Sequence, residues 1–474
     1  MKLLTKIFLE WNLANQNLFM VNSMQTINYL NIIPYSSFNS WDVKYFLKKD
    51  SFFKPTIPLV LFGEFLSKAE IKKINIEDNN TYEILGVRSY GKGAFINREV
   101  KGNTLKMRVY QQAKPNHLFW CKVDTKNGAF GIITEELSKG LGSSNMTFAE
   151  IDIKKANVDF IQILFKSKRI YEYLDGFVTG TTNRKYIRPD QLINEIFIPL
   201  PTIEEQKRIV SSYNAKLQLA QQQEQQAKTL ETEIERYLFE ELGVEKMIVK
   251  PFVKGVLNVF NFSEIFDRWD YNKGSSSVFS ILHQSKYPVK TLDEAFNFTN
   301  RSWNKKAHQE KNFTYVEMGG IDAGLGIVDA TNLEVSKAPS RATQTILKGD
   351  LIIGTTRPYL KKFAIVMEKN NENIASSAFQ IIAPSENYCL DYLLEYIKSE
   401  FGVKQFEYYM TGALYPAITS KDLRRVLIPF PPVAKQKQIS NHMNSLKKQI
   451  KELNVLSAKN KEEAIVEFEK EIFN

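Results

Sequence analysis

The chain has 474 residues, which is room for about two to four domains of ordinary size. Hydrophobic residues make up 43% of it and charged residues 24%, as in soluble globular proteins, and no apolar run reaches the roughly 18–20 residues that span a bilayer. Two cysteines and four scattered histidines give neither a disulfide framework nor a metal-ligand spacing. We therefore expect no metal, no membrane association, no secretory signal and a reducing cytoplasmic setting.

The formal net charge of +10 is unevenly distributed along the sequence. Segment 202–245 has five Lys and Arg against nine Asp and Glu, and segment 432–474 has eight against six, so their net charges are −4 and +2. The rest of the chain must carry +12, which suits globular parts that face a polyanion. A basic surface that only keeps the protein soluble explains the same composition.

The first 201 residues favour a mixed α/β domain. HLFWCKVDTKNGAFGIIT predicts a strand, a turn at Asn127-Gly128 and a second strand, and VDFIQILFKSKRIYEYL favours short helices. The loop GVRSYGKG nearly matches the phosphate-binding pattern GxxxxGK followed by Ser or Thr, but Gly93 replaces the required hydroxyl. We therefore predict a structural glycine loop and no nucleotide site.

A long helix is predicted after the motif IPLPTIEEQKRIV, which begins at Ile198. Its prolines impose an extended backbone, and Thr202 with Glu205 forms a capping-box pattern. The run from Glu204 to Leu242 contains no Gly or Pro. Its apolar residues recur at helical spacing at Ile209, Tyr213, Leu217, Ala220, Ala227, Leu230, Ile234 and Tyr237.

The sequence then repeats this organisation. IPFPPVAKQKQI begins at Ile428, 230 residues after the first motif, and Trp41-Asp42 is echoed by Trp269-Asp270 at an offset of 228. Four residues of YEILGVRSYGKG, from Tyr82, match YVEMGGIDAGLG, from Tyr315, at an offset of 233. FVTG, ending at Gly180, likewise corresponds to YMTG, ending at Gly412. Because these matches keep their order while the offsets drift only slightly, we predict two divergent copies of one unit.

The second copy gives clearer local signals. LKGDLIIGTTRPYLKKFAIVME predicts a turn at Gly349-Asp350 followed by strands, and CLDYLLEYIKSEFGVKQFEYYM favours helices. The last segment places apolar residues with the 4-3-4-3 spacing of a heptad seam, at Ile439, Met443, Leu446, Ile450 and Leu453.

Two long helices with one narrow apolar stripe each need a partner in water. The obvious partner of each is the other, and their opposite net charges are compatible with pairing; two separate surface helices are the alternative. The predicted fold is α/β mixed, with two repeated globular domains joined by an antiparallel coiled-coil helix pair of pseudo-two-fold symmetry. The domain boundaries are 1–201, 202–245, 246–431 and 432–474.

The two proline-helix motifs, the paired Trp-Asp motifs and GDLIIGTTRPYL resemble those of type I restriction–modification specificity subunits. The resemblance implies a non-catalytic subunit with two target-recognition domains, each of which reads half of a bipartite site in double-stranded DNA. It also implies two modification subunits, which bind S-adenosylmethionine and methylate adenine, and restriction subunits for cleavage. The stretch LKMRVYQQAKPNHLFWCKV departs from the family's pattern, which leaves the fold of 102–125 open.

Readout of DNA needs side chains that reach base edges, and backbone contacts need Lys, Arg or hydroxyl groups. The candidates in the first half are Arg88, Ser89, Tyr90, Lys92, Asn97, Arg98, Lys101, Thr181, Thr182, Asn183 and Arg184. Those in the second half are Arg301, Trp303, Asn304, Lys305, Lys306, Thr355, Thr356, Arg357, Tyr359, Lys361 and Lys362. Any one of them has a solvated surface position as its alternative, and Trp303 equally suits a core.

Catalytic alternatives find little support in the sequence. Pro189-Asp190 with Glu205 and Lys207 loosely imitates a nuclease pattern, but Glu205 and Lys207 begin the predicted helix. No Asn-Pro-Pro-Tyr or Asp-Pro-Pro-Tyr string of an amino-methyltransferase occurs. The remaining alternatives are a specificity subunit of a related methyltransferase or restriction system without type I cleavage, and a coiled-coil scaffold that does not bind DNA.

Overall fold

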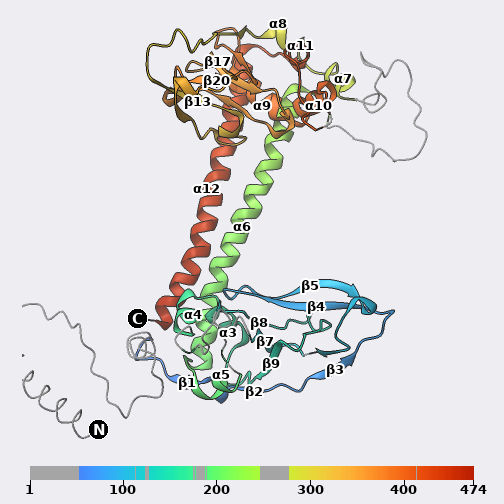
Figure 1. The fold of residues 1–474 in the computed structure, drawn as a ribbon, viewed down its shortest axis with the longest axis vertical. Helices are drawn as coiled ribbons and strands as arrows, with labels where there is room; N and C mark the ends of the chain where they lie inside the picture. The colour runs from blue at the N-terminus through green and yellow to red at the C-terminus, as the bar shows by residue number, and fades with distance from the viewer. Residues whose placement is uncertain are drawn as a thin grey trace, which may run out of the picture. The chain divides into compact units, whose positions relative to one another are not determined.

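The computed structural model describes residues 53–112, 114–122, 127–174, 177, 187, 189–245, 277–412 and 414–473 (Figure 1). These residues divide into two compact units. Unit 1 holds the described residues up to Gln218 together with those from Asn460 onward, and unit 2 holds Leu219–Lys459. The two Trp-Asp motifs and the candidates Thr181, Thr182, Asn183 and Arg184 lie outside the described residues.

Unit 1 is a mixed α/β unit built on antiparallel strands. Its main sheet has the order β2 (Leu66–Lys68), β9 (Met146–Ile151), β7 (His117–Cys121), β8 (Phe130–Ile132). The two-stranded sheets are β1 (Leu59–Leu61) with β10 (Phe197–Pro199), β3 (Lys72–Asn75) with β6 (Val109–Gln112), and β4 (Thr81–Arg88) with β5 (Gly93–Lys101). The helices are η2 (Phe62–Glu64), η3 (Gly102–Thr104), α3 (Val158–Leu164), α4 (Lys168–Leu174) and α5 (Pro189–Glu195).

Aromatic side chains hold the core of unit 1 together. Phe130 of β8 stacks on Phe165 just after α3 with ring centroids 3.8 Å apart, and Trp120 of β7 is fully buried beside Phe130. The β7–β8 hairpin and the two short helices in 158–174 confirm the sequence predictions. The segment 102–125, which the sequence left open, contributes η3, β6 and β7.

Unit 2 contains two four-stranded sheets. One has the order β12 (Phe298–Thr299), β21 (Phe379–Ile382), β18 (Leu351–Gly354), β19 (Phe363–Ile365), and the other β16 (Thr331–Glu334), β13 (Asn312–Val316), β20 (Ile374–Ser376), β17 (Ala342–Thr345). The two-stranded sheets are β14 (Ile321–Asp322) with β15 (Gly326–Ile327) and β11 (Val289–Thr291) with β22 (Leu427–Pro429). The predicted turn and strands around 349–365 and the helices in 389–410 are confirmed.

The helices of unit 2 contribute buried aromatic residues to its core. They are α7 (Ser277–Leu282), α8 (Leu292–Ala295), α9 (Leu390–Lys398), α10 (Glu400–Tyr409), α11 (Ser420–Arg424), and the short η7 (Met318–Gly320), η8 (Val335–Lys337), η9 (Pro358–Leu360) and η10 (Glu368–Asn370). Tyr392 and Tyr396 of α9 are fully buried, and their hydroxyls donate to the carbonyl oxygens of Pro429 and Leu427. These bonds tie α9 to strand β22, which leads into the last long helix.

Two helices of 40 residues each, α6 (Ile203–Leu242) and α12 (Val433–Ile472), confirm the two long helices predicted after the proline motifs. At the start of α6, the Glu205 amide donates to Thr202 Oγ1 at 3.3 Å, whereas the Glu205 carboxylate accepts from Arg208. The predicted apolar stripes are buried or half-buried along both helices.

Ion pairs link α6 and α12 within each unit. In unit 1, Lys216 Nζ lies 3.1 Å from Glu463 Oε2, and Arg208 Nη2 lies 3.0 Å from Glu471 Oε2. In unit 2, Lys435 Nζ lies 2.6 Å from Glu241 Oε2. In unit 1, the position on α12 falls as the position on α6 rises, so the two helices run in opposite directions there.

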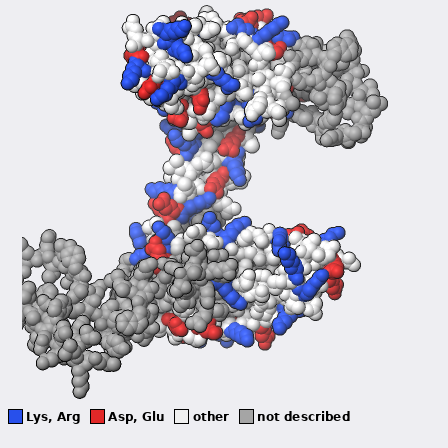
Figure 2. Space-filling view, in the orientation of Figure 1, with Lys and Arg blue, Asp and Glu red and all other residues white. Residues whose placement is uncertain are grey.

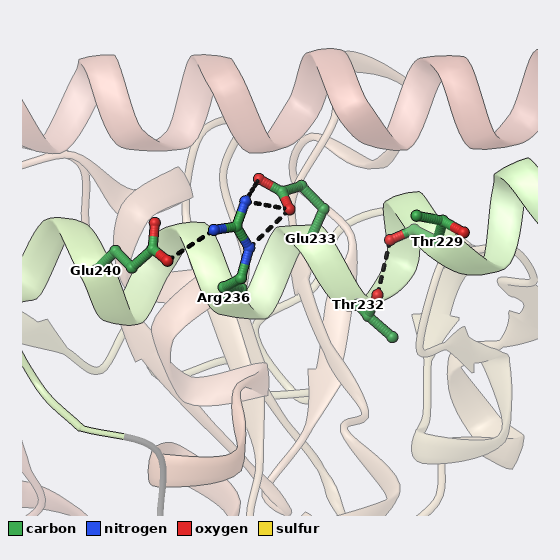
Figure 3. A network of polar contacts seen from close by, with 5 residues as sticks. All are labelled: Thr229, Thr232, Glu233, Arg236 and Glu240. Atoms are coloured by element: carbon green, nitrogen blue, oxygen red, sulfur yellow. Dashed lines mark hydrogen bonds and ion pairs between the residues drawn. The ribbon is translucent and has the colours of Figure 1, made fainter.

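Charge along each helix favours this direction. Within 219–242, α6 has two Lys and Arg against six Glu, and within 433–459, α12 has six Lys against one Glu. Arg236 is held by Glu233 and Glu240 of its own helix (Figure 3), which leaves the other glutamates of this half of α6 in excess. In unit 1 the signs reverse, since α6 has three cations against two Glu over 203–218 and α12 has two against five over 460–472. Parallel helices would instead oppose acidic half to acidic half.

One buried glutamine near the start of each long helix binds the backbone of the adjacent α/β part. Gln206 Nε2 donates to Pro201 O at 2.8 Å and to Lys155 O at 3.1 Å, and its Oε1 accepts from the Asn157 amide at 2.7 Å. In unit 2, Gln436 Nε2 donates to Pro431 O at 2.8 Å.

The hydrogen bond accepted by the glutamine side chain repeats as well. Gln436 Oε1 accepts from the Cys389 amide at 2.9 Å, and Cys389 precedes α9 just as Asn157 precedes α3. The proline strands repeat with it, because Leu59 pairs with Pro199 in β1–β10 and Val289 pairs with Pro429 in β11–β22, 230 residues later in both strands. The duplicated motif therefore builds the same connection twice.

Replacing Gln436 should test this connection. In Gln436→Ala the Cys389 amide and the Pro431 carbonyl lose buried partners, so we expect unit 2 to lose about 2–4 kcal/mol of unfolding free energy. Urea denaturation followed by circular dichroism measures the loss, and amide exchange at Cys389 locates it. The matched control is Gln449→Ala, an exposed position on the same helix. Equal losses in the two variants would show that the buried amide has no special role.

Candidate nucleic-acid interface

The candidates of unit 1 gather on the β4–β5 hairpin. Register shifts between Ile84 and Leu85, so that Asn97 is the extra residue of a β-bulge in β5. Bulges redirect side chains out of a regular strand, and Asn97 and Arg98 are both exposed. Figure 2 shows Lys and Arg side chains over the part of unit 1 that holds this hairpin. The exposed candidates are Arg88, Tyr90, Lys92, Asn97, Arg98 and Lys101, and Ser89 is half-buried.

Arg88 is positioned by stacking. Its guanidinium carbon lies 4.2 Å from the centroid of the Phe95 ring across the hairpin. Gly86 leaves room for this packing, because a Cβ there would lie 3.0 Å from the Phe95 ring and 3.3 Å from Asn97 Cβ. The hairpin therefore presents an arginine, an aromatic ring and an amide side by side.

The glycine loop between β4 and β5 has a structural role, in agreement with the sequence analysis. The amides of Tyr90 and Gly91 donate to the carbonyls of Asn127 and Gly128 at 2.6 and 2.8 Å, so they are occupied within the protein. A Cβ on Gly91 would lie 1.9 Å from Phe165 O. The repeat shares the left-handed glycine at the end of this turn, since Gly93 and Gly326 have φ of +85° and +80°, whereas the positive φ of Gly91 has no counterpart at Gly324.

Arg301 of unit 2 has an internal partner. Its Nη1 lies 2.5 Å from Asp350 Oδ2 and its Nη2 lies 3.1 Å from Oδ1, and the Asp350 carboxylate is fully buried. Asp350 also accepts from the Leu347 amide at 2.7 Å in the turn before β18. This bidentate pair gives Arg301 a structural role, which the spacing of 49 residues hid from the sequence analysis.

The neighbouring candidates divide into one half-buried residue and three exposed ones. Trp303 packs on Phe313 with ring centroids 4.8 Å apart and donates to His308 Nδ1, as expected of a residue at the edge of a core. Asn304, Lys305 and Lys306 are exposed in the turn that follows. The Trp303 amide donates to Thr343 O, which places this turn beside β17.

The sequence TTRPYLKK forms a strained turn between β18 and β19. Arg357 and Lys361 flank η9, and both have left-handed backbones, with φ of 49° and 56°. L-residues other than Gly, Asn and Asp rarely adopt this conformation, so tertiary contacts must hold it. Thr355, Thr356, Arg357, Tyr359, Lys361 and Lys362 are all half-buried.

Two lysines fix the β14–β15 turn beside this strained turn. Lys362 Nζ donates to Ile321 O, and Lys398 Nζ of α9 donates to Ala323 O at 2.7 Å. Burial lowers the pKa of Lys398 to about 8, and nearby Glu395 opposes this effect. Glu395 in turn pairs with Lys447 of α12. Lys362 is thereby engaged in the protein's own structure, whereas no such bond involves the Lys361 ammonium among the described residues.

The sequence analysis missed one loop of unit 2. Residues 414–417 lie against the strained turn, because the Arg357 amide donates to Pro416 O at 2.7 Å and Thr356 forms a β-bridge with Ala417. The repeat contained the signal for it. Since FVTG matches YMTG, the loop TGTTNRKY, chosen in the first half, corresponds to TGALYP in the second.

No group of three or more His, Cys, Asp and Glu able to hold a metal ion occurs among the described residues. No helix in the described part of the chain has the length and apolar character needed to cross a membrane.

The sequence of this chain is similar to those of known proteins. Residues 284–460 match the family described as Type I restriction modification DNA specificity domain. A Methanocaldococcus jannaschii protein, named as the specificity subunit of type I restriction enzyme MjaX, is 25% identical over 294 residues, which cover 60% of this chain. The match spans 59% of that relative's own length. The resemblance stated from the motifs is thereby confirmed.

Solved structures extend the likeness to the fold. A chain from a structure on complex assembly and conformational transition of the type I R-M system is superposable with a TM-score of 0.54 at 16% identity, covering 88% of this chain and 97% of that one. The HsdS subunit from Thermoanaerobacter tengcongensis gives a TM-score of 0.49 at the same identity and coverage. The first of these supports the mixed α/β fold.

The two arginines of unit 2 should differ in their effects on stability. Arg301→Ala leaves the buried Asp350 carboxylate without its cation, so we expect a loss of about 3–5 kcal/mol in unfolding free energy. The exposed Arg341 is the control, and Arg341→Ala should change stability by less than about 0.5 kcal/mol. Denaturant unfolding of the three proteins decides the matter. A near-neutral Arg301→Ala would return Arg301 to the set of DNA-contacting candidates.

Proposed function

We propose that this chain, whose residues 284–460 carry a type I restriction modification DNA specificity domain, is the DNA-recognition subunit of a type I restriction–modification complex. The family match is the observation that carries the proposal. The M. jannaschii relative supports it, because the similarity there extends over 294 residues of this chain. The chain itself is non-catalytic in this proposal and acts on DNA in the cytoplasm.

In this proposal each half of the chain reads one half of a bipartite site. The recognition domains are 1–201 and 246–431, and the helical segments 202–245 and 432–474 form an antiparallel coiled coil with pseudo-two-fold symmetry. The repeated glutamine connection and the charge reversal along α6 and α12 support this division. The helix pair would then set the number of unread base pairs between the half-sites.

The proposed partners follow from the same assignment. Two modification subunits, which bind S-adenosylmethionine and methylate adenine, dock on the chain, and restriction subunits join them for cleavage. A related methyltransferase or restriction system without type I cleavage uses the same recognition subunit and differs only in whether restriction subunits are present. A coiled-coil scaffold without DNA is the second alternative, and the DNA specificity match disfavours it.

The proposed DNA contacts are the exposed and half-buried candidates, although Thr355 Oγ1 donates to Ala378 O and Arg357 Nη2 donates to Leu414 O. In unit 1 these are Arg88, Ser89, Tyr90, Lys92, Asn97, Arg98 and Lys101, and the loop Thr181, Thr182, Asn183 and Arg184 remains a proposal from sequence. In unit 2 they are Asn304, Lys305, Lys306, Thr355, Thr356, Arg357, Tyr359 and Lys361. We leave out Arg301, Trp303 and Lys362, since Asp350, the core and Ile321 O hold them.

The first experiment tests dependence on partners. The purified chain alone should bind duplex DNA weakly and should neither methylate nor cleave it. Together with its modification subunits it should protect one bipartite sequence, which methylome sequencing of cells carrying both identifies. Methylation by the chain alone, with mass spectrometry excluding a co-purified enzyme, would refute the recognition-subunit assignment.

The second experiment tests the helix pair as a spacer. Four residues added to each helix, after Ala220 and after Ala458, nearly preserve helical phase and lengthen the pair by about 6 Å. Since base pairs rise by about 3.4 Å, the unread spacer should grow by one or two base pairs while both half-sites stay the same. Two-residue insertions at the same places rotate the stripe by about 200° and should abolish methylation. An unchanged spacer in a fully active four-residue variant would show that the helices do not set the distance.

A further inference from the structure

The loop after α10 exposes two large apolar side chains. Leu414 is 81% exposed and Tyr415 is 73% exposed, and no other large hydrophobic side chain in the described residues is as exposed as Leu414. Exposed apolar groups that stand together mark contact surfaces more often than isolated ones do. Their position beside the strained turn of unit 2 therefore calls for a functional reason.

Hydrogen bonds fix the residues at the base of this loop. Thr411 and Ala417 exchange amide–carbonyl bonds of 2.9 Å across its base. The Ile418 amide donates to Thr355 O at 2.9 Å, and the Arg357 amide donates to Pro416 O at 2.7 Å. Because both arms of the loop are fixed in this way, its tip presents Leu414 and Tyr415 from a rigid support.

Arg357 braces the tip from the neighbouring turn. Its Nη2 donates to Leu414 O at 3.2 Å, and its guanidinium carbon lies 5.1 Å from the centroid of the Tyr415 ring. Its Nε is buried with no hydrogen-bond partner among the described residues. An arginine with a left-handed backbone and an unpaired buried Nε is an unfavourable arrangement, which points to a role in positioning the loop.

The chemistry around the tip is that of a DNA-reading surface. The cations of Arg357 and Lys361 and the hydroxyl of Thr356 suit phosphates, which orient a protein on the duplex without reading it. The Thr355 hydroxyl instead donates to Ala378 O at 2.8 Å. Apolar side chains read the duplex in another way, through the thymine methyl group in the major groove. The loop thus adds a means of base discrimination to a turn that otherwise offers charge and hydroxyl groups.

We infer that Leu414 and Tyr415 are specificity-determining contacts of unit 2, which pack against a thymine methyl group in the second half-site. The inference rests on the proposed function. Arg357 acts here as a positioning residue for the loop, in addition to any phosphate contact of its own. The apolar contact should set base preference and contribute nothing to the salt dependence of binding, because it neutralises no phosphate.

The test uses the full chain in complex with its modification subunits and a duplex that carries the sequence found by methylome mapping. Each thymine of the second half-site is replaced in turn by deoxyuracil, which lacks only the 5-methyl group. For the wild type we expect one replacement to weaken binding about tenfold. Leu414→Ser and Tyr415→Ser should weaken binding to the thymine duplex by a similar factor and should be insensitive to that replacement.

Controls separate this contact from folding and from charge. Met367→Ser changes an apolar side chain that is 61% exposed at the other end of β19, and it should bind both duplexes as the wild type does. Tyr415→Phe retains the ring and should retain discrimination. Lys361→Ala should weaken binding to all sequences evenly and flatten the salt dependence, whereas the two serine variants should leave the salt slope unchanged.

Two outcomes would overturn the inference while leaving the proposed function intact. One is a set of serine variants that bind and discriminate like the wild type, and the other is an even loss across all sequences with a flatter salt slope. If the wild-type complex selects no sequence at all, the proposed function itself fails.

Discussion

The architecture depends on one buried side-chain amide at the start of each long helix. A primary amide both donates and accepts, so Gln206 and Gln436 each satisfy a carbonyl of the preceding proline segment and an amide at the start of a neighbouring helix. No other uncharged side chain of similar shape offers both functions at that reach. Because each bond is buried, the angle between the long helix and the α/β part is fixed by geometry that is costly to break.

Within each unit the net charges of the α6 and α12 segments are opposite in sign, and the glutamines attach these helices to the α/β part. Single ion pairs on exposed helices stabilise little, but a sign that reverses midway along both helices penalises the parallel arrangement as a whole. A carboxylate of a long helix also accepts a hydrogen bond at the start of α4 in unit 1 and at the start of α10 in unit 2. Ser167 Oγ donates to Glu469 Oε1 in unit 1, and the Glu400 amide donates to Glu235 Oε1 in unit 2. Each α/β part is thereby fastened to both α6 and α12.

Local sequence patterns predicted those helices and turns that depend on interactions between residues close together in the chain. The absence of Gly and Pro after Glu204 predicted α6, and Asn127-Gly128 predicted the β7–β8 hairpin. Contacts between distant residues were beyond that reasoning. Arg301 resembled a DNA contact because its partner, Asp350, lies 49 residues away, and Gln436 stood within the quoted motif without an assigned role because Cys389 is distant in sequence. Comparing the two repeats position by position would have recovered the 411–417 loop.

The glutamine connection also bears on how such a chain can change over time. Every partner of Gln206 and Gln436 is a main-chain atom, and main-chain atoms are the same whatever side chains the α/β part carries. An α/β part with other side chains, or one from another protein, would therefore make the same angle with the long helix. The condition is that its backbone begins the helix equivalent to α3 or α9 in the same place. Variation in the surface loops is thus separated from the attachment of the long helices, so that under the proposed function new specificities can arise without a change in the glutamine connection.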